Sequence, residues 1–269
     1  MLTATAVGLV VCLVALGIQW SGLLHVVELK TLDHRFTRYA HTTPMSADLV
    51  LVAIDESSLA TFGRWPWPRD RHGYMVRYLK EAGARAIVFD ILFLEPDADE
   101  PVFDRDFAKD LRAAGNVFLP FLLDTPVAAP EISSSTDSPL PEVALTKATV
   151  ALQALPARQH HPGRHYTSLK APIPLLTEAA QRLGFIDLFP DSDGTLRRVP
   201  LLAYIQERPV SQLALSVAQE LLGATQLTLT AETLRLGRVS IPLDAQGDML
   251  ITWRGGLEQH YPVYSAGAV

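Results

Sequence analysis

Residues 48–55 read DLVLVAID, and this stretch decides the fold class. It is a near-continuous apolar run, which is typical of a strand buried on both faces of a parallel sheet. Two more apolar runs follow it, and a helical segment separates each run from the one before. The expected strands lie at about 49–54, 86–89 and 117–121, and the expected helices at about 70–82 and 104–114. Because strands alternate with helices, we predict a βαβαβ core with a parallel sheet.

The second half of the chain predicts antiparallel strands instead. FIDLFPDSDGTLRRVPLLAYI, at 185–205, is typical of a hairpin, because Gly194 of the DSDG turn can adopt a positive φ. Short apolar strands alternate around 227–241, and another tight turn at 244–247 precedes MLITW. The fold class is therefore α/β, with a mixed, partly parallel sheet flanked by helices and a C-terminal antiparallel hairpin portion. A stretch rich in Pro, Ser and Thr, residues 124–147, is expected to be a flexible insertion.

The N-terminal segment carries no Asp, Glu, Lys or Arg up to Leu24. An apolar run of 18 or more residues can cross a hydrocarbon core of about 30 Å as a helix. We therefore predict a transmembrane helix over residues 1–28 that anchors the chain to the cell membrane. A cleaved signal peptide is the alternative, although signal sequences have shorter apolar regions and a basic segment that MLTATA lacks.

Residues 29–47 are predicted to form a juxtamembrane helix and a linker, and residues 48–269 a single folded domain. Leu29, Leu32 and Phe36 recur at i, i+3 and i+7, which gives the juxtamembrane helix a narrow apolar stripe.

Composition excludes several classes of function. A net charge of −6 and a pI of about 5.7 give no basic surface for nucleic acid. The single cysteine, Cys12, lies in the apolar run, so no disulfide forms within the soluble part. The chain has no G-x-S-x-G, H-E-x-x-H or P-loop motif, and we expect no catalytic residue and no cofactor.

Charged residues gather around the first βαβ unit. Asp55 and Glu56 close the first strand, Arg69 precedes the next helix, and Asp90 lies near the end of the second strand. If the two strands are neighbours, Asp55 and Asp90 lie roughly 5–10 Å apart at the carboxyl edge where α/β sheets bind ligands. One interpretation is a ligand or cation pocket. The other is structural, with Arg69 paired to Asp55, Glu56 or Asp90 and the remaining carboxylates capping helices.

Trp65 belongs to the unusual stretch WPWPR, residues 65–69. Its two prolines stiffen the loop, and its two indoles need burial or a partner. Trp65 therefore belongs either to an aromatic wall for a ligand, to a membrane-interface or dimer contact, or to a rigid loop that plugs the end of the core.

Two further groups resemble metal sites only weakly, so we expect no metal. His160, His161 and His165 lie on a loop without nearby acids, and Asp191 and Asp193 lack the later Glu of a calcium loop.

These motifs together resemble one family. DLVLVAIDESSLATFGRWPWPR, GARAIVFDILFLEP and GNVFLP, followed in order by GFIDLFPDSDGTLRRVPLL and PLDAQGDMLITWRG, are similar to the CHASE domain of type 2, as is LDHRF at 32–36. Asp187 stands where this family has Asn, and Gln212 where it has Ser.

The resemblance implies a sensory domain on the periplasmic or extracellular side of a membrane receptor, regulating an intracellular enzyme. That enzyme is most often an adenylate or guanylate cyclase, and otherwise a histidine kinase, a diguanylate cyclase or a protein kinase. On this interpretation the chain is a sensor fragment whose output domain follows Val269. It implies a membrane partner, a homodimer and an unknown small-molecule or protein ligand, but it carries over no binding residue. The positive-inside rule points the other way, because Lys30, Arg35 and Arg38 favour a cytoplasmic flank.

Two other functions stay open. One is a membrane-anchored, cation-dependent hydrolase that uses Asp55 and Asp90. The other is an assembly module that binds no ligand.

Overall fold

The computed structural model describes residues 23–39, 48–97, 100–126, 141–154, 163–253 and 261–269. By its contacts the chain divides into two compact units, each of which is described by itself. Unit 1 comprises Met1–Leu51, Pro190–Arg197 and Thr252–Val263, and unit 2 comprises Val52–Phe189, Arg198–Ile251 and Tyr264–Val269.

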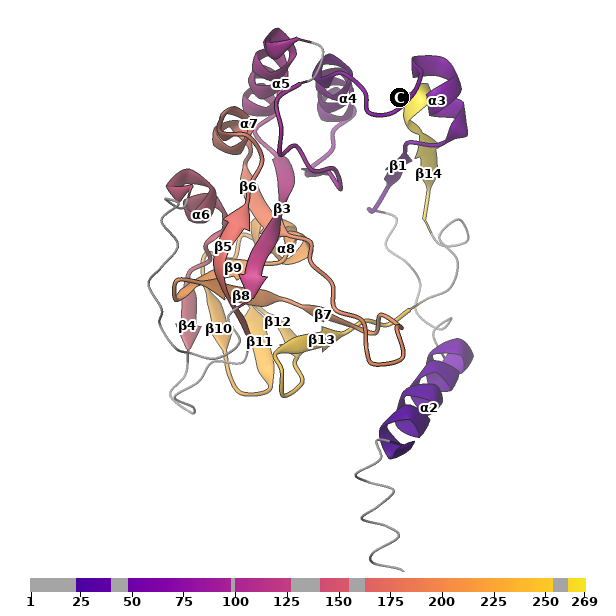
Figure 1. Cartoon of the computed structure of the whole chain (residues 1–269), viewed down its shortest axis with the longest axis vertical. Helices are drawn as coiled ribbons and strands as arrows, with labels where there is room; N and C mark the ends of the chain where they lie inside the picture. Colours follow the sequence, from indigo (N-terminus) through magenta and orange to yellow (C-terminus); the bar gives the residue numbers. More distant parts are fainter. Residues whose placement is uncertain (1–22, 40–47, 98–99, 127–140, 155–162, 254–260) are drawn as a thin grey trace, which may run out of the picture. The chain divides into compact units, whose positions relative to one another are not determined.

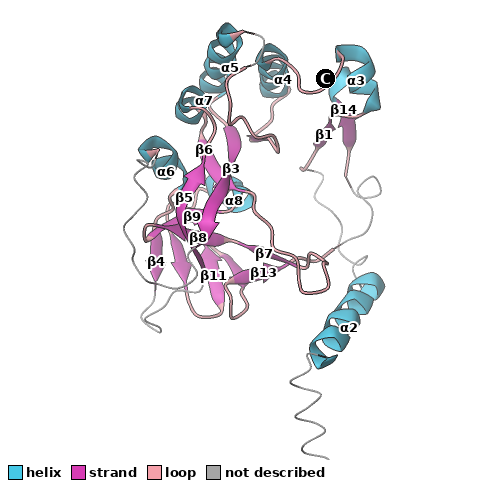
Figure 2. Ribbon diagram, viewed as in Figure 1, coloured by secondary structure: helices cyan, strands magenta, loops and turns pink. Residues whose placement is uncertain are grey.

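Helices and strands are both short and numerous (Figures 1 and 2). The helices are α2 (Leu23–Tyr39), α3 (Glu56–Phe62), α4 (Arg69–Glu81), α5 (Pro101–Ala114), α6 (Glu142–Ala148), α7 (Pro174–Ala179), α8 (Leu213–Leu221) and the 3-10 helix η3 (Ala266–Ala268). The strands are β1 (Leu51–Ala53), β2 (Ile87–Val88), β3 (Val117–Pro126), β4 (Leu152–Ala154), β5 (Arg164–Lys170), β6 (Arg182–Phe185), β7 (Arg198–Pro200), β8 (Leu202–Ile205), β9 (Arg208–Ser211), β10 (Leu227–Leu229), β11 (Thr233–Leu236), β12 (Val239–Pro242), β13 (Asp248–Leu250) and β14 (Val263–Ser265).

A mixed six-stranded sheet forms the centre of unit 2. Its strands run in the order β2-β3-β5-β8-β9, and β6 also pairs with β3. β3 is parallel to β2 and β6 but antiparallel to β5. The helices α4, α5 and α7 pack in sequence beside it, and α5 contributes the fully buried Phe107 and Leu111 to the core. The predicted mixed α/β class and the parallel pairing of the second and third strands are confirmed.

A second apolar cluster lies under the later strands. The four-stranded sheet β12-β11-β10-β4 buries alternate leucines of β10 and β11, and β7 pairs with β13 in a separate antiparallel pair. The hairpin predicted at 185–205 is not formed, because β6 pairs with β3 and β7 pairs with β13. β10, β11 and β12 run antiparallel to one another, as expected for this C-terminal portion. β4 is the exception, because it joins β10 in parallel.

The first predicted strand does not join the central sheet. β1 pairs instead with β14 in a two-stranded sheet, and Leu49, Val50 and Leu51 are exposed. The prediction of three parallel neighbours is therefore wrong for this strand. An apolar pattern indicates that a strand pairs with another strand, but it does not identify that strand. Here the partner of β1 lies more than two hundred residues later in the chain.

The helix at the N-terminal side is α2, a 17-residue helix that begins at Leu23. It confirms the helix predicted to follow the N-terminal apolar segment, and in this helix Leu29 is buried and Leu32 and Phe36 are half-buried. Within the described residues no helix is both long and apolar enough to cross a membrane. The predicted transmembrane helix at 1–28 lies mostly outside the described residues, as does the middle of the predicted insertion, while β3 and α6 occupy the ends of that insertion.

Candidate functional site

Asp55 is the N-cap of α3. Its Oδ1 accepts hydrogen bonds from the Ser58 backbone N–H at 2.8 Å, from Ser58 Oγ at 2.7 Å and from Ser265 Oγ at 2.7 Å. These donors, with Ser58 first, lower the pKa of the Asp55 carboxyl to about 2. The carboxylate thus caps the start of α3 and joins it to Ser265.

The other predicted acids lie apart from Arg69. Glu56 and Asp90 are exposed, and among the described residues neither they nor Asp55 form an ion pair with Arg69. The predicted contact of Arg69 with one of these three acids is therefore wrong. It assumed that the strands before Asp55 and Asp90 are neighbours, whereas β1 pairs with β14.

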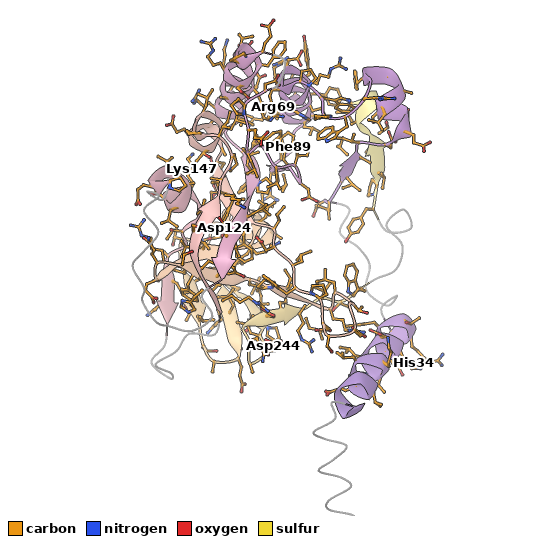
Figure 3. The ribbon with its side chains drawn as sticks, in the orientation of Figure 1. His34, Arg69, Phe89, Asp124, Lys147 and Asp244 are labelled. Atoms are coloured by element: carbon orange, nitrogen blue, oxygen red, sulfur yellow. The ribbon has the colours of Figure 1, made fainter. Side chains whose placement is uncertain are left out.

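Arg69 instead connects the beginnings of α4 and α5, near the labelled Phe89 in Figure 3. Its Nε lies 3.5 Å from Asp104 Oδ1, its backbone N–H donates to Asp97 Oδ2 at 2.8 Å, and its guanidinium lies 4.7 Å from the Phe93 ring centre. Asp104 Oδ2 in turn accepts from the Asp97 backbone N–H at 2.9 Å. Two helix starts are thus joined by one arginine and two buried aspartates.

His72 lies beside this group, in a cluster of aromatic rings. Its ring contacts Trp65, Trp67, Phe89, Phe93 and Phe107, with ring centres 5.5–6.4 Å away. The side chain is fully buried, and neither ring nitrogen has a hydrogen-bond partner. Burial first, and then the Arg69 charge, lower the pKa of His72 to about 4.

The two indoles of WPWPR have different environments. Trp67 is buried and donates from Nε1 to the Gly63 carbonyl at 3.0 Å, so it plugs the end of the core. Trp65 packs edge-on against Trp67 but stays 43% exposed. Of the two, Trp65 is the indole that a ligand or a partner can reach.

Unit 1 contains a second cluster of charges, centred on Arg197. The Arg197 Nε donates to Asp33 Oδ1 and the Arg197 Nη2 donates to Asp33 Oδ2, both at 2.7 Å. Nη1 donates to Asp191 and Asp193 at 2.9 Å, and Nη2 donates to Asp193 at 2.9 Å. The Arg197 side chain has no exposed surface, although the Asp33 side chain that covers it is 35% exposed. One guanidinium therefore binds three carboxylates near the surface of the unit.

Comparison with known families identifies the chain. The model of the CHASE2 domain matches residues 9–269. The chain belongs to the CHASE2 family. No curated protein and no solved structure matches it.

The Arg197 cluster of this CHASE2 domain was not foreseen from the sequence. LDHRF and DSDGTLRR, which hold its four residues, contributed to the family resemblance, but no pairing between them was predicted. The available signal was an arginine directly before an apolar strand, since a buried guanidinium requires acids nearby.

The cluster also sets the electrostatics of the CHASE2 domain near α2. Hydrogen bonds from Arg197 hold the pKa of Asp33 and of Asp193 below the usual range of an aspartate. The same contacts, with Asp33 first, raise the pKa of Arg197. Asp33, Asp193 and Arg197 are therefore charged over the whole physiological range, and Lys30 adds a cation 3.4 Å from Asp193.

Proposed function

We propose that this CHASE2 domain is the extracytoplasmic sensory part of a membrane-bound receptor that regulates an intracellular enzyme. The observation that carries the proposal is the match to the CHASE2 family over nearly the whole chain, because that family consists of sensory extracellular domains of signalling proteins. The regulated enzyme is an adenylate or guanylate cyclase, and the receptor is a homodimer in the cell membrane.

Contacts within the protein engage most of the charged side chains named above, and this disfavours the catalytic interpretation. Asp55 caps a helix, Arg69 and Asp104 join two helices, and the three aspartates around Arg197 are all engaged. The hydrolase interpretation relied on Asp55 and Asp90 at neighbouring strand ends, and that arrangement is not formed.

Among the candidate ligand-binding residues, four are exposed. Trp65, Glu56 and Asp90 are exposed, and so is Asp55, although Asp55 and the half-buried Arg69 are engaged by groups of the protein itself. We therefore expect an unknown small molecule or protein ligand to contact Trp65 first, with Arg69 holding the surrounding helices in place.

The location is tested by cysteine labelling in intact cells. The single Cys12 is replaced by Ser, and the exposed Ser240 on the outer strand β12 is replaced by Cys. Labelling of Ser240→Cys by a membrane-impermeant maleimide without permeabilisation is the expected result, and the Cys12→Ser background alone is the control. Labelling only after permeabilisation contradicts an extracytoplasmic domain.

The output is tested with the full-length receptor in isolated membranes. Formation of cyclic AMP from ATP, or of cyclic GMP from GTP, is expected, together with a change in rate when residues 48–269 are deleted. Activity that is the same with and without the domain contradicts a regulatory role.

A further inference from the structure

Arg197 holds helix α2 through one residue of that helix, Asp33. The contact is bidentate, with two N–H donors on two carboxylate oxygens at 2.7 Å. The remaining donors of Arg197 bind Asp191 and Asp193, which belong to the same short segment as Arg197 itself. The cation therefore has partners on its own loop and a single partner on α2.

This contact is compatible with one register of α2. The described residues of α2 contain two acids, Glu28 and Asp33. They lie five positions apart, so they point about 140° away from each other around the helix. The residues one turn from Asp33 are Leu29, Lys30, Phe36 and Thr37, and none of them carries a carboxylate. If α2 slides or rotates by a turn, Arg197 finds no second acid to bind.

We propose that Arg197 and Asp33 are positioning residues that set the register of α2, and that the sensory domain transmits its state through this contact. The signalling part rests on the proposed function, because α2 matters to an output only if the chain is a membrane receptor. A single buried polar contact can specify one register among several that apolar packing tolerates.

The contact can be released without stranding a charge. If Asp33 leaves, Asp191 and Asp193 still bind Arg197, so the loop keeps its own hydrogen bonds. Removal of Arg197 has a larger effect than removal of Asp33. Without Arg197, three carboxylates face one another, and Lys30 is the nearest remaining cation, at 3.4 Å from Asp193 and 3.8 Å from Asp33. Loss of Asp33 should free the helix, whereas loss of Arg197 should destabilise the whole unit.

The first test measures hydrogen–deuterium exchange of α2 in the full-length receptor held in lipid nanodiscs. Asp33→Asn should speed exchange of the amides of residues 29–39 by about tenfold, as expected when a charged hydrogen-bonded pair is lost. Glu28→Gln is the matched control, because it removes the same charge from an exposed position of the same helix. Arg197→Gln should in addition lower the melting temperature more than Asp33→Asn does. Equal exchange in Asp33→Asn and wild type overturns the proposal.

The second test moves the acid by one turn. The double variant Asp33→Asn with Thr37→Asp places a carboxylate four positions, or about 6 Å, along the helix. It should restore the slow exchange of α2 while cyclic AMP formation stays different from wild type, because α2 is held in a shifted register. If cyclic AMP formation returns to the wild-type rate, or if Asp33→Asn never changed it, the signalling role is overturned. A receptor that forms no cyclic nucleotide contradicts the proposed output, and the exchange of α2 then decides the positioning role by itself.

Discussion

Arg164 and Asp248 form a bidentate ion pair that joins the first residue of β5 to the first residue of β13. Arg164 Nη1 lies 2.6 Å from Asp248 Oδ1 and Nη2 lies 2.8 Å from Oδ2, and the guanidinium lies 4.3 Å from the centre of the Phe189 ring. Asp248 is buried, so the pair is only partly screened by water. We expect Asp248→Asn and Arg164→Met each to lower the free energy of unfolding by about 2–4 kcal/mol. In urea denaturation the double variant should lose clearly less than the sum of the two, and strict additivity would show that the pair contributes nothing.

His72 should make the stability of the domain depend on pH. Its pKa is about 4 in the folded protein and 6.5 when unfolded, so the unfolded state binds more protons between these values. The neutral ring contributes its full stability above pH 6.5, and this contribution is lost as the pH falls toward 4. The total loss in unfolding free energy is about 3 kcal/mol. His72→Leu should flatten this part of the curve of unfolding free energy against pH. His34→Leu, at an exposed position, is the control and should leave the slope unchanged.

Gly184 should tolerate no side chain. A Cβ at this position of β6 would lie 2.6 Å from the Leu213 backbone nitrogen and closer still to Leu213 Cα, at the start of α8. Because backbone atoms cannot move aside, Gly184→Ala should destabilise the domain by at least about 3 kcal/mol. Gly223→Ala is the comparison, since its Cβ meets nothing within 4 Å and only the positive φ of 62° is strained. That variant should lose about 1 kcal/mol, and equal losses would contradict the clash.

Asp187 is a half-buried carboxyl, and burial raises its pKa. A raised pKa means that the folded state binds more protons than the unfolded state, so stability is lost as the pH rises from 3.8 through the folded pKa. Asp187→Asn keeps an acceptor for the Leu123 backbone N–H, which now donates to Oδ2 at 2.9 Å. At pH 7 the variant should gain up to about 1 kcal/mol in unfolding free energy, since the side chain is only half-buried. A loss of stability at pH 7 that disappears at pH 3 would contradict this account.

Substitutions of Trp65 and Trp67 should distinguish an effect on ligand binding from an effect on stability. Trp67→Ala removes a buried ring and should lower the unfolding free energy by about 3–5 kcal/mol. Trp65→Ala removes a half-exposed ring and should lose about 1 kcal/mol or less. In the full-length receptor Trp65→Ala should nevertheless alter the response to stimulus. A response identical to wild type would exclude Trp65 from the ligand site.

The sequence predicts those parts of the fold whose partners are close along the chain. β2 and β3 are joined by a single helix, and both their parallel pairing and the positions of α4 and α5 follow from local patterns. β1 shows the limit, because its apolar pattern is as clear as that of β3 but its partner lies at Val263–Ser265. Strand pairing over such a separation depends on the whole fold, and no local pattern encodes it.

The candidate site shows the same limit at the level of side chains. Arg69 was singled out correctly as a charge that needs a partner, yet the partner is Asp104 on α5 rather than an acid of the first two strands. Arg197 was missed because its partner Asp33 lies 164 positions earlier. Residue type indicates that a buried cation needs an acid, and only the folded chain identifies which acid that is.

The residues that complete the contacts of α3 lie near the end of the described chain, and this separation affects how the domain folds during its synthesis. Ser265 Oγ binds Asp55 across 210 positions, and the Gly267 backbone N–H donates to Ser58 Oγ at 3.0 Å. At the usual speed of translation, a ribosome needs about 10–40 s to make that length of chain. Throughout this interval the nascent chain carries β1 and α3 without the residues that complete them, so this corner of the domain cannot close before Ser265 and Gly267 have been made.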